Sequence, residues 1–323
     1  MSMRFRPIVL AAIAATVVAA FGADISGPLT GYVFDSTSRI VRPVLGIPGA
    51  ATLGGGLNLG FDVTLAAIAP KQDYLLAVDT DGQVWLVRLG AGTADRLDTL
   101  HGTPERINFS PNGSAALLIQ GGTADVFTGL PGSPALARTV ALNGIPTSSD
   151  FAVSDDGSAV LAAASDAVSV AGSSAEWRSL SGAGADARVA FSPGSHDAAA
   201  ASRATNTVTL FHNPADGGDS VTLAGPDDGI DNAAGVAFTT DGRVLVASGS
   251  GNIAILVTNG SSRATVSCGC TPTGLAPMGG LFRLTDRTDA PLWMVDARSG
   301  DARVFFVPAL RADTATLTGA QQQ

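Results

Sequence analysis

One pattern recurs along this chain and constrains its fold more than any other feature. An apolar run is followed by a short turn rich in Pro, Asn, Asp and Gly, and then by a second apolar run; the clearest copy is INFSPNGSAALLI, Ile107–Ile119. Five related stretches occur, and the six anchor residues are Ile68, Phe109, Val153, Phe191, Phe238 and Leu284. Their spacings of 41, 44, 38, 47 and 46 residues indicate a repeat architecture, whose units bury apolar surface against their neighbours.

The turns predict antiparallel hairpins. Asn-Gly and Asp-Gly permit the positive φ values of a type I′ turn, so Pro111, Asn112 and Gly113 are expected to close the hairpin between the first two strands of a unit. Third strands such as Gly82–Leu89 follow, and most units add a fourth, such as Asp219–Gly225. Four short strands in about 40–45 residues predict an all-β chain folded as a β-propeller.

A family resemblance rests on the same residues. The turns F-S-P-N-G and V-S-D-D-G, followed by x-V-x-V/L strands, resemble those of YVTN/WD40-type β-propeller repeats over roughly residues 31–310. The Gly-His and Trp-Asp dipeptides of WD40 repeats are absent, since Trp85 is followed by Leu86. The nearer resemblance is to exported bacterial propellers of the YVTN or lactonase-like kind. Lactonase-like members imply a metal held in the central channel, but neither Glu105 nor Glu176, the two glutamates, lies in a distinctive motif.

The ring has to close. The last unit, Leu281–Leu310, is interpreted as first, second and third strands, with a weak fourth strand at Thr314–Gly319. The segment Gly31–Gly46 looks like strands three and four of a unit, and an N-terminal strand is expected to complete the C-terminal blade and remove free sheet edges. Six anchors favour six blades. Seven blades, with the N-terminal hairpin starting an extra one, is the alternative.

The N-terminus has the pattern of an export signal. Arg4 and Arg6 precede the apolar run Ile8–Gly22, and small residues precede a cut before Ala23. The predicted organisation is a signal peptide at 1–22, a propeller at 23–312 and a disordered tail at 313–323. This predicts a periplasmic or extracellular protein with no membrane insertion beyond the signal peptide. An uncleaved anchor is the alternative.

Charge argues against one class of partner. The chain has 19 basic and 28 acidic residues, a net charge of −9, and no basic stripe. Nucleic acids and anionic membranes attract basic surfaces, so neither is expected as a partner.

Few residues suggest chemistry. Cys268 and Cys270 are the only cysteines, and an even pair in an exported protein favours a disulfide over two free thiols or a redox or metal pair. Two acidic clusters suggest calcium, with solvated loop as the alternative. The first, Asp79–Gly82, lies where a hairpin turn is expected. The second supplies the weak metal candidates Asp227, Asp228, Asp231 and Asn232.

Two functions remain. The first is an exported, non-catalytic scaffold, expected to be monomeric and to bind a protein or an envelope polymer without a cofactor. It rests on the repeat, the signal and the lack of a Gly-x-Ser-x-Gly or phosphate-loop motif. The second is a propeller enzyme, a lactonase-like hydrolase or lyase, with a central-channel site, calcium being the divalent metal considered. Polar residues at one turn position in successive repeats would favour it, and only turn formers occur there.

Overall fold

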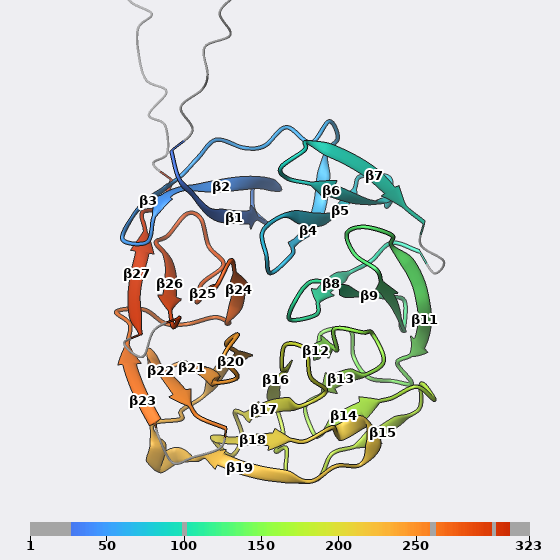
Figure 1. Cartoon of the computed structure of the whole chain (residues 1–323), viewed down its shortest axis with the longest axis vertical. Coiled ribbons are helices and arrows are strands. Elements are labelled where there is room, and N and C mark those ends of the chain that lie inside the picture. Colours follow the sequence, from blue (N-terminus) through green and yellow to red (C-terminus); the bar gives the residue numbers. More distant parts are fainter. Residues whose placement is uncertain (1–26, 99–101, 259–262, 299–301, 311–323) are drawn as a thin grey trace, which may run out of the picture.

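The repeated hairpins fold into seven antiparallel sheets arranged in a ring (Figure 1). The structure is a computed structural model that describes residues 27–98, 102–258, 263–298 and 302–310. The all-β propeller predicted from the sequence is confirmed. The favoured count of six blades is wrong, and the alternative of seven is confirmed, because the N-terminal strands form a blade of their own.

Each blade is one sheet of consecutive strands. Blade 1 has three strands: β1 (Leu29–Asp35), β2 (Ile40–Ile47) and β3 (Ala50–Leu53). Blade 2 comprises β4 (Val63–Ile68), β5 (Tyr74–Asp79), β6 (Val84–Arg88) and β7 (Thr93–Leu97). Blade 3 comprises β8 (Arg106–Phe109), β9 (Ala115–Gln120), β10 (Thr123–Thr128) and β11 (Ala135–Ala141). Blade 4 comprises β12 (Asp150–Val153), β13 (Val160–Ala163), β14 (Val168–Ala171) and β15 (Trp177–Ser179). Blade 5 comprises β16 (Ala187–Phe191), β17 (Ala198–Ser202), β18 (Thr207–Phe211) and β19 (Ser220–Ala224). Blade 6 comprises β20 (Ala233–Phe238), β21 (Val244–Ser248), β22 (Asn252–Leu256) and β23 (Arg263–Ser267). Blade 7 comprises β24 (Ala276–Met278), β25 (Leu281–Arg283), β26 (Leu292–Asp296) and β27 (Arg303–Val307).

The turn chemistry acts as predicted, but with a different turn type. In blade 3, Gly113 N donates to Ser110 O (3.0 Å) and Ser110 N donates to Ala115 O (2.9 Å). Gly113 has φ +75°, whereas Asn112 is not among the residues with positive φ. A type I′ turn needs positive φ at both central residues, so the hairpin is instead a turn whose fourth residue is left-handed. Gly157 (φ +73°) has the same role in blade 4.

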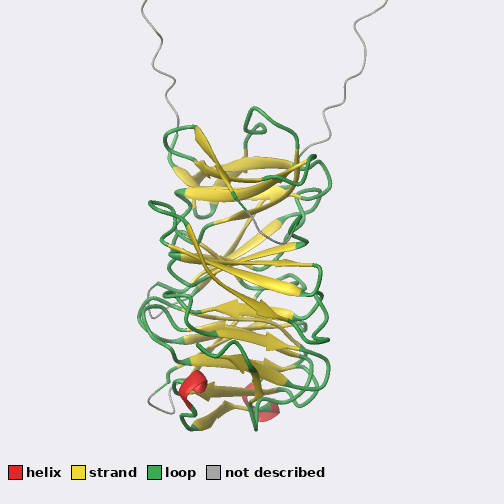
Figure 2. Ribbon diagram, turned by 90° about the vertical axis from the view of Figure 1, so that its right-hand side faces the viewer, coloured by secondary structure: helices red, strands yellow, loops and turns green. Residues whose placement is uncertain are grey.

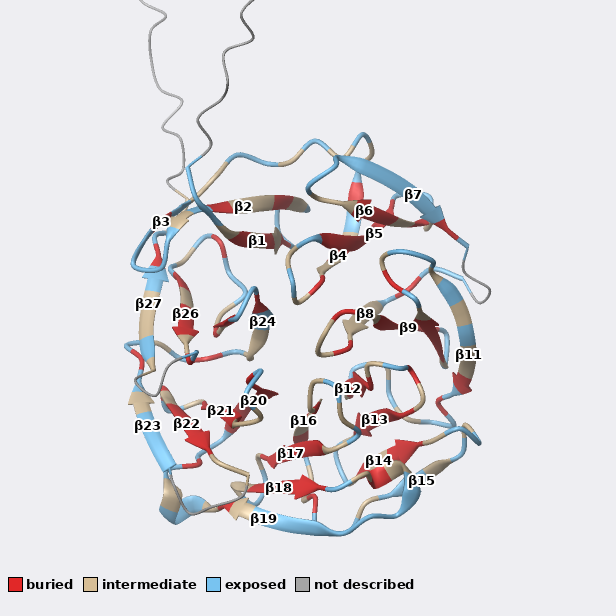
Figure 3. Ribbon diagram, viewed as in Figure 1, coloured by how far each residue is buried: buried red, intermediate tan, exposed pale blue. Residues whose placement is uncertain are grey.

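The core lies between the blades. The seven clusters of buried apolar side chains each join two adjacent blades. Figure 2 shows the sheets from the side, packed face to face. Ala198–Ser202, which is β17, is fully buried, because small side chains let neighbouring sheets approach closely. Outer strands such as β7 and β23 are largely exposed (Figure 3). The ring is therefore stabilised by stacking each blade on the next.

Blade 7 is one strand out of step with the sequence interpretation. Leu281–Arg283 is the second strand, not the first, and Arg303–Val307 is the fourth, not the third. The first strand is the three-residue β24, which contains Pro277. Blade 7 therefore has four strands without help from the N-terminus, and the predicted closure by an N-terminal strand is wrong. The weak strand expected at Thr314–Gly319 lies outside the described residues.

Blade 1 lacks the strand nearest the axis. Gly31 lies against Met278, at the end of β24, while the carboxylate of Asp35 meets the Thr288 side chain in the loop after β25. β1 therefore runs in the direction of the second strands. Its contact with β4, the first strand of the next blade, matches the contact of the second strand β13 with β16. The strand β3 contacts β27, the outer strand of blade 7. The sequence of Gly31–Gly46 predicts strands three and four, whereas β1, β2 and β3 correspond to strands two, three and four.

Candidate functional site in the central channel

A cavity of about 1070 Å³ lies along the axis of the ring. Its walls are residues of the first strands β4, β8, β12, β16, β20 and β24, and blade 1 contributes Phe34. We call its two ends the turn end, where the hairpins between first and second strands lie, and the entry end, where the first strands begin. Propellers commonly bind ligands along such a channel or on the loops around it, which makes this region a candidate site.

Three charged residues occupy one position on successive first strands. Arg106, Asp150 and Arg188 each lie three residues before the anchor of their blade, near the entry end. This is a polar series of the kind that would favour a channel site, although it lies on strands rather than in turns. In the sequence each of the three directly precedes an apolar run, so the pattern of apolar runs and turns does not include them. Aligning the anchors of blades 3, 4 and 5 would have revealed it.

The first two of these residues hold neighbouring blades together. Nη1 of Arg106 donates to the carbonyl oxygens of Thr147 (3.2 Å) and Ser149, in the segment before β12. Oδ2 of Asp150 accepts a hydrogen bond from Val189 N in blade 5 (2.9 Å). Each side chain thus makes a hydrogen bond to the backbone of the following blade. Such bonds are stronger than those between neutral groups, because one partner is charged.

Arg188 continues the series but is only partly engaged. Its Nε donates to the carbonyl oxygen of Ala234 in blade 6 (3.2 Å). None of the described residues bonds its Nη1 or Nη2, and Arg188 lines the cavity. Burial raises the pKa of Asp150 above its usual range, and the Val189 hydrogen bond and the charges of Arg188 and Arg106 only partly offset this. The entry end therefore combines one carboxylate that resists ionisation with two permanent positive charges.

The channel is more positive than the rest of the protein. Its lining contains five basic and three acidic side chains: Lys71, Arg106, Arg188, Arg283 and Arg298 against Asp150, Asp241 and Asp286. Over the whole sequence the acids exceed the bases by nine. Arg283 is paired with Asp286 (2.6 Å). The wall is suited to hold a negatively charged group better than a cation.

A second polar contact joins three blades at the turn end. The carboxylate of Asp155, in the blade 4 hairpin, accepts hydrogen bonds from Asn112 N of blade 3 (2.8 Å) and Gly194 N of blade 5 (2.7 Å). Side chains at this hairpin position therefore fix the relative positions of adjacent blades.

The metal candidates of the second acidic cluster lie in the loop between β19 and β20. Asp228 ends the 3-10 helix η2 (Pro226–Asp228), accepts a hydrogen bond from Gly225 N (2.8 Å) and pairs with Arg263 of β23. The carboxamide of Asn232 accepts from Nε of Arg203 (2.9 Å). Asp227 and Asp231 are exposed. Within the described ranges no three His, Cys, Asp or Glu side chains converge in a way that could hold a metal ion. Calcium binding here stays a prediction.

The first acidic cluster forms a turn between β5 and β6. The Asp79 carboxylate accepts hydrogen bonds from Asp81 N (2.9 Å), Gln83 N (2.8 Å) and Nε1 of Trp85 (2.7 Å). Burial opposes ionisation of Asp79, but these hydrogen bonds outweigh it and lower its pKa. The carboxylate is thus used to order its own turn.

One Ser, His and Asp group was not anticipated. Nε2 of His196 lies 3.1 Å from Oγ of Ser158 and 3.0 Å from Oδ2 of Asp156. A Ser-His-Asp triad needs the serine on one ring nitrogen and the carboxylate on the other. Here one nitrogen meets both, so the group does not have a triad's geometry. His212 pairs with Asp197 (3.3 Å).

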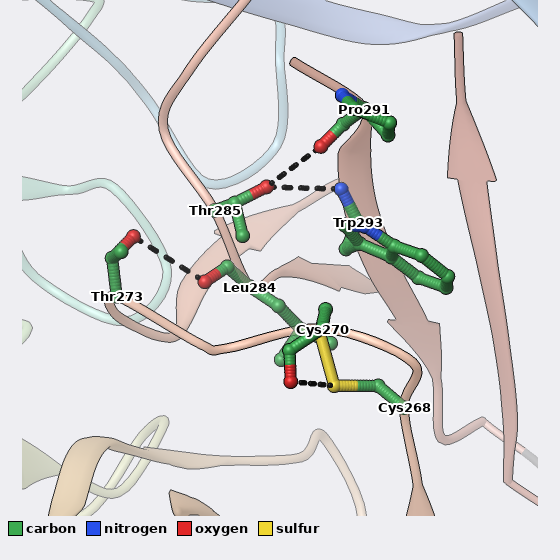
Figure 4. The surroundings of a disulfide bond; sticks show 7 residues. All are labelled: Cys268, Cys270, Thr273, Leu284, Thr285, Pro291 and Trp293. Carbon is green, nitrogen blue, oxygen red and sulfur yellow. Dashed lines mark hydrogen bonds between the residues drawn. A yellow bond between two sulfur atoms is a disulfide. The ribbon is translucent and has the colours of Figure 1, made fainter. Parts of the chain in front are cut away.

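The cysteines lie between β23 and β24. The structure joins Cys268 and Cys270 in a disulfide, and Figure 4 shows it beside Leu284 and Trp293. Cys268 N donates to Gly251 O (2.8 Å). The disulfide therefore borders the apolar cluster between blades 6 and 7, away from the channel lining.

Comparison with known proteins identifies the fold. No protein-family model and no curated protein matches this chain. Among solved structures, the WD40 repeats of RRP9 superpose with a TM-score of 0.55 at 10% identity, covering 77% of this chain and 81% of that one. A chain of the mitotic checkpoint complex gives 0.53 at 12% identity, covering 88% and 96%. No described helix has the length and apolarity to cross a membrane. The chain has the fold of a WD40-type β-propeller, with seven blades.

Proposed function

We propose that the protein is an exported, non-catalytic β-propeller that binds a protein partner in the cell envelope, with an envelope polymer as the other candidate partner. The observation that carries this proposal is an apolar cluster on blade 1. Leu29, Leu45 and Ile47 are 48%, 37% and 57% exposed. Leu29 lies opposite Leu45 across β1 and β2, and Ile47 ends β2. Exposed apolar side chains gathered on one surface are typical of interaction sites.

The ring supports such a role. The charged series of the channel and Asp155 bond adjacent blades, which gives the exposed surfaces a firm frame. Functions of propellers are carried by surfaces and loops on this frame more than by the fold itself. Of the similar structures described above, one is a chain of a complex. Export rests on the sequence pattern at residues 1–22.

The test compares charged substitutions inside and outside the cluster. The variants are Leu45→Asp and Ile47→Asp, with Val221→Asp as a matched control, since Val221 is 44% exposed on β19. After cross-linking in the native envelope, a partner captured by the wild type and the control should be lost at least tenfold with the cluster variants. Capture that is equal for all forms would contradict the proposal. The N-terminal residue of the exported protein should lie near Ala23, and an intact Met1 would contradict cleavage.

A second candidate is a ligand or substrate site in the channel, in keeping with a lactonase-like enzyme. The observation that favours it is the free end of the Arg188 guanidinium in a cavity lined by more bases than acids. A thermal melt against divalent ions, EDTA, lactones and sugars tests it. A ligand at 100-fold its Kd stabilises by about 2.7 kcal/mol. A stabilisation that Arg188→Gln abolishes would support the channel site, and a panel without any shift would oppose it.

A further inference from the structure

One position of the first strands divides the entry end of the channel into a charged part and an apolar part. Three residues before their anchors, blades 3, 4 and 5 have Arg106, Asp150 and Arg188. Blades 2 and 6 have Leu65 and Gly235 at the same position, and all five residues line the cavity. The charged side chains therefore gather on three neighbouring blades and are not spread around the ring.

The charged series ends at blade 6 for a steric reason. A Cβ atom on Gly235 would lie 2.5 Å from the backbone nitrogen of Leu275 and 2.7 Å from its Cβ, so a longer side chain cannot lie there. Leu275 belongs to the loop before β24 and lines the cavity. An apolar side chain thus stands next to the place where a fourth charged residue would lie.

Apolar side chains also lie across the channel from Arg188. Consecutive blades are neighbours, so in a ring of seven blade 5 faces the boundary between blades 1 and 2. Figure 1 shows β16 on the opposite side of the ring from β1 and β4. Phe34, near the end of β1, and Leu65 of β4 are partly exposed, and both line the cavity. The entry end thus has Arg188 on one wall and two apolar side chains on the facing wall.

The Arg188 guanidinium has the geometry to receive a carboxylate. Its Nε donates to the carbonyl oxygen of Ala234 (3.2 Å), which orients the group, while Nη1 and Nη2 have no hydrogen-bond partner in the part of the chain that the structure describes. Two such nitrogens on one planar group match the two oxygens of a carboxylate. Arg106 differs, because its Nη1 already donates to the carbonyl oxygens of Thr147 and Ser149.

The charge on this wall is not cancelled from within. Asp150 lies 4.0 Å from Nη2 of Arg106 and accepts a hydrogen bond from Val189 N, and among the described residues no acid forms an ion pair with Arg188. Burial raises the pKa of Asp150, so this carboxyl repels an incoming anion less than an ordinary aspartate would. Arg188 is therefore a half-buried positive charge that a ligand's negative charge can satisfy.

We propose that the entry end of the channel binds an organic carboxylate, with its carboxylate on Nη1 and Nη2 of Arg188 and an apolar body that extends across the channel toward Phe34 and Leu65. This inference rests on the channel site given above as the second candidate function, and it names the ligand class of that site. Arg106 and Arg188 repel a cation. A phosphate dianion would meet only one free guanidinium, and a neutral apolar molecule would leave that guanidinium without a partner.

The test is isothermal titration calorimetry of the full chain with octanoate, butyrate, octan-1-ol and inorganic phosphate. Octanoate should bind at one site per chain, and butyrate should bind more weakly by about fourfold for each methylene removed, because less apolar surface is buried. Octan-1-ol has the same chain without the charge and should bind at least about tenfold more weakly than octanoate. This comparison uses the unaltered protein, so it stands even if a variant fails to fold.

Variants locate the site. Arg188→Gln keeps an N–H donor but removes the charge and the second nitrogen, and should weaken octanoate binding at least about tenfold. Arg178→Gln is the matched control, because Arg178 of β15 also donates to a backbone carbonyl, that of Pro214, but is not part of the cavity lining. Leu45→Asp alters the apolar cluster of blade 1. Both of these variants should change the affinity for octanoate less than about twofold, the effect of an ordinary surface substitution.

The outcomes separate the ligand class from the site. Equal binding of octanoate and octan-1-ol, tighter binding of inorganic phosphate, or octanoate binding that survives Arg188→Gln or is lost with Leu45→Asp would each overturn the proposal. If no carboxylate binds but a lactone or a sugar stabilises the protein in a way that Arg188→Gln abolishes, the ligand class is wrong and the channel site remains. If no probe binds at all, both fail.

Discussion

Replacing Asp155 tests how far the ring depends on polar contacts between hairpins. Asp155→Ala removes the acceptor of two backbone N–H groups, those of Asn112 and Gly194, from blades 3 and 5. A hydrogen bond to a charged group contributes about 1.5–3 kcal/mol. The Gly194 contact is exposed, so water replaces it cheaply, whereas the Asn112 contact is partly buried. The expected loss of unfolding free energy is about 2–3 kcal/mol.

A graded series sharpens the test. Asp155→Asn retains one acceptor oxygen and should lose about half as much unfolding free energy as Asp155→Ala, because a carboxamide can accept only one of the two hydrogen bonds well. Asp219→Ala is the control, since Asp219 is exposed at the end of the β18–β19 connection and its carboxylate makes no hydrogen bond or ion pair to a described residue. Where the denaturant dependence of the unfolding free energy is unchanged, the shifts in urea midpoint give the differences in stability between the variants and the wild type. An Asp155→Ala protein within about 0.5 kcal/mol of the wild type, the range of ordinary surface changes, would refute the reasoning.

Three further predictions follow from single contacts. Burial opposes ionisation of Asp35, but hydrogen bonds from neighbours such as Ser38 outweigh it and lower the pKa of Asp35 from 3.8 to about 2. The stability that the Asp35 carboxylate contributes should be present above pH 4 and disappear as the pH falls toward 2. In thermal melts between pH 5 and 2, the Asp35→Asn protein should lack this part of the acid transition. Tyr74→Phe should cost about 1–3 kcal/mol in urea denaturation, because the buried Tyr74 hydroxyl donates to the carbonyl oxygen of Gly113, which would be left unpaired; no change would show that water takes its place. Thiol titration of the unreduced protein should find neither Cys268 nor Cys270 reactive, and two reactive thiols would contradict the disulfide.

The hairpins of blades 2 to 6 could be predicted because their signals are local. A left-handed glycine such as Gly113 and the apolar runs around it determine both the turn and the strands. The strand order of blade 7 could not be predicted, because β24 is three residues long and contains Pro277, which is unusual within a strand. Proline is tolerated there because β24 pairs only with β25, so its other edge, toward the channel, needs no donor. No local sequence pattern predicts such a strand.

The site could be predicted only in part. Arg106, Asp150 and Arg188 share a position that aligned anchors reveal, but the bonds they make depend on how neighbouring blades sit. The pairing of Asp228 with Arg263 joins a loop to an outer strand of the next blade, and no spacing in the sequence encodes it. Contacts between repeats require the packing that only the assembled ring provides.

The short inner edge of blade 1 has a consequence for how the protein opens. Gly279 N, after β24, donates to the carbonyl oxygen of Pro70, after β4 (2.8 Å), so blades 7 and 2 touch directly beside the start of β1. The innermost circle of the protein is thus completed by six blades, and blade 1 is fastened to it from outside. Sub-global opening of blade 1 would then break its apolar contacts with blades 7 and 2, while the Gly279–Pro70 hydrogen bond still joins those two blades to each other.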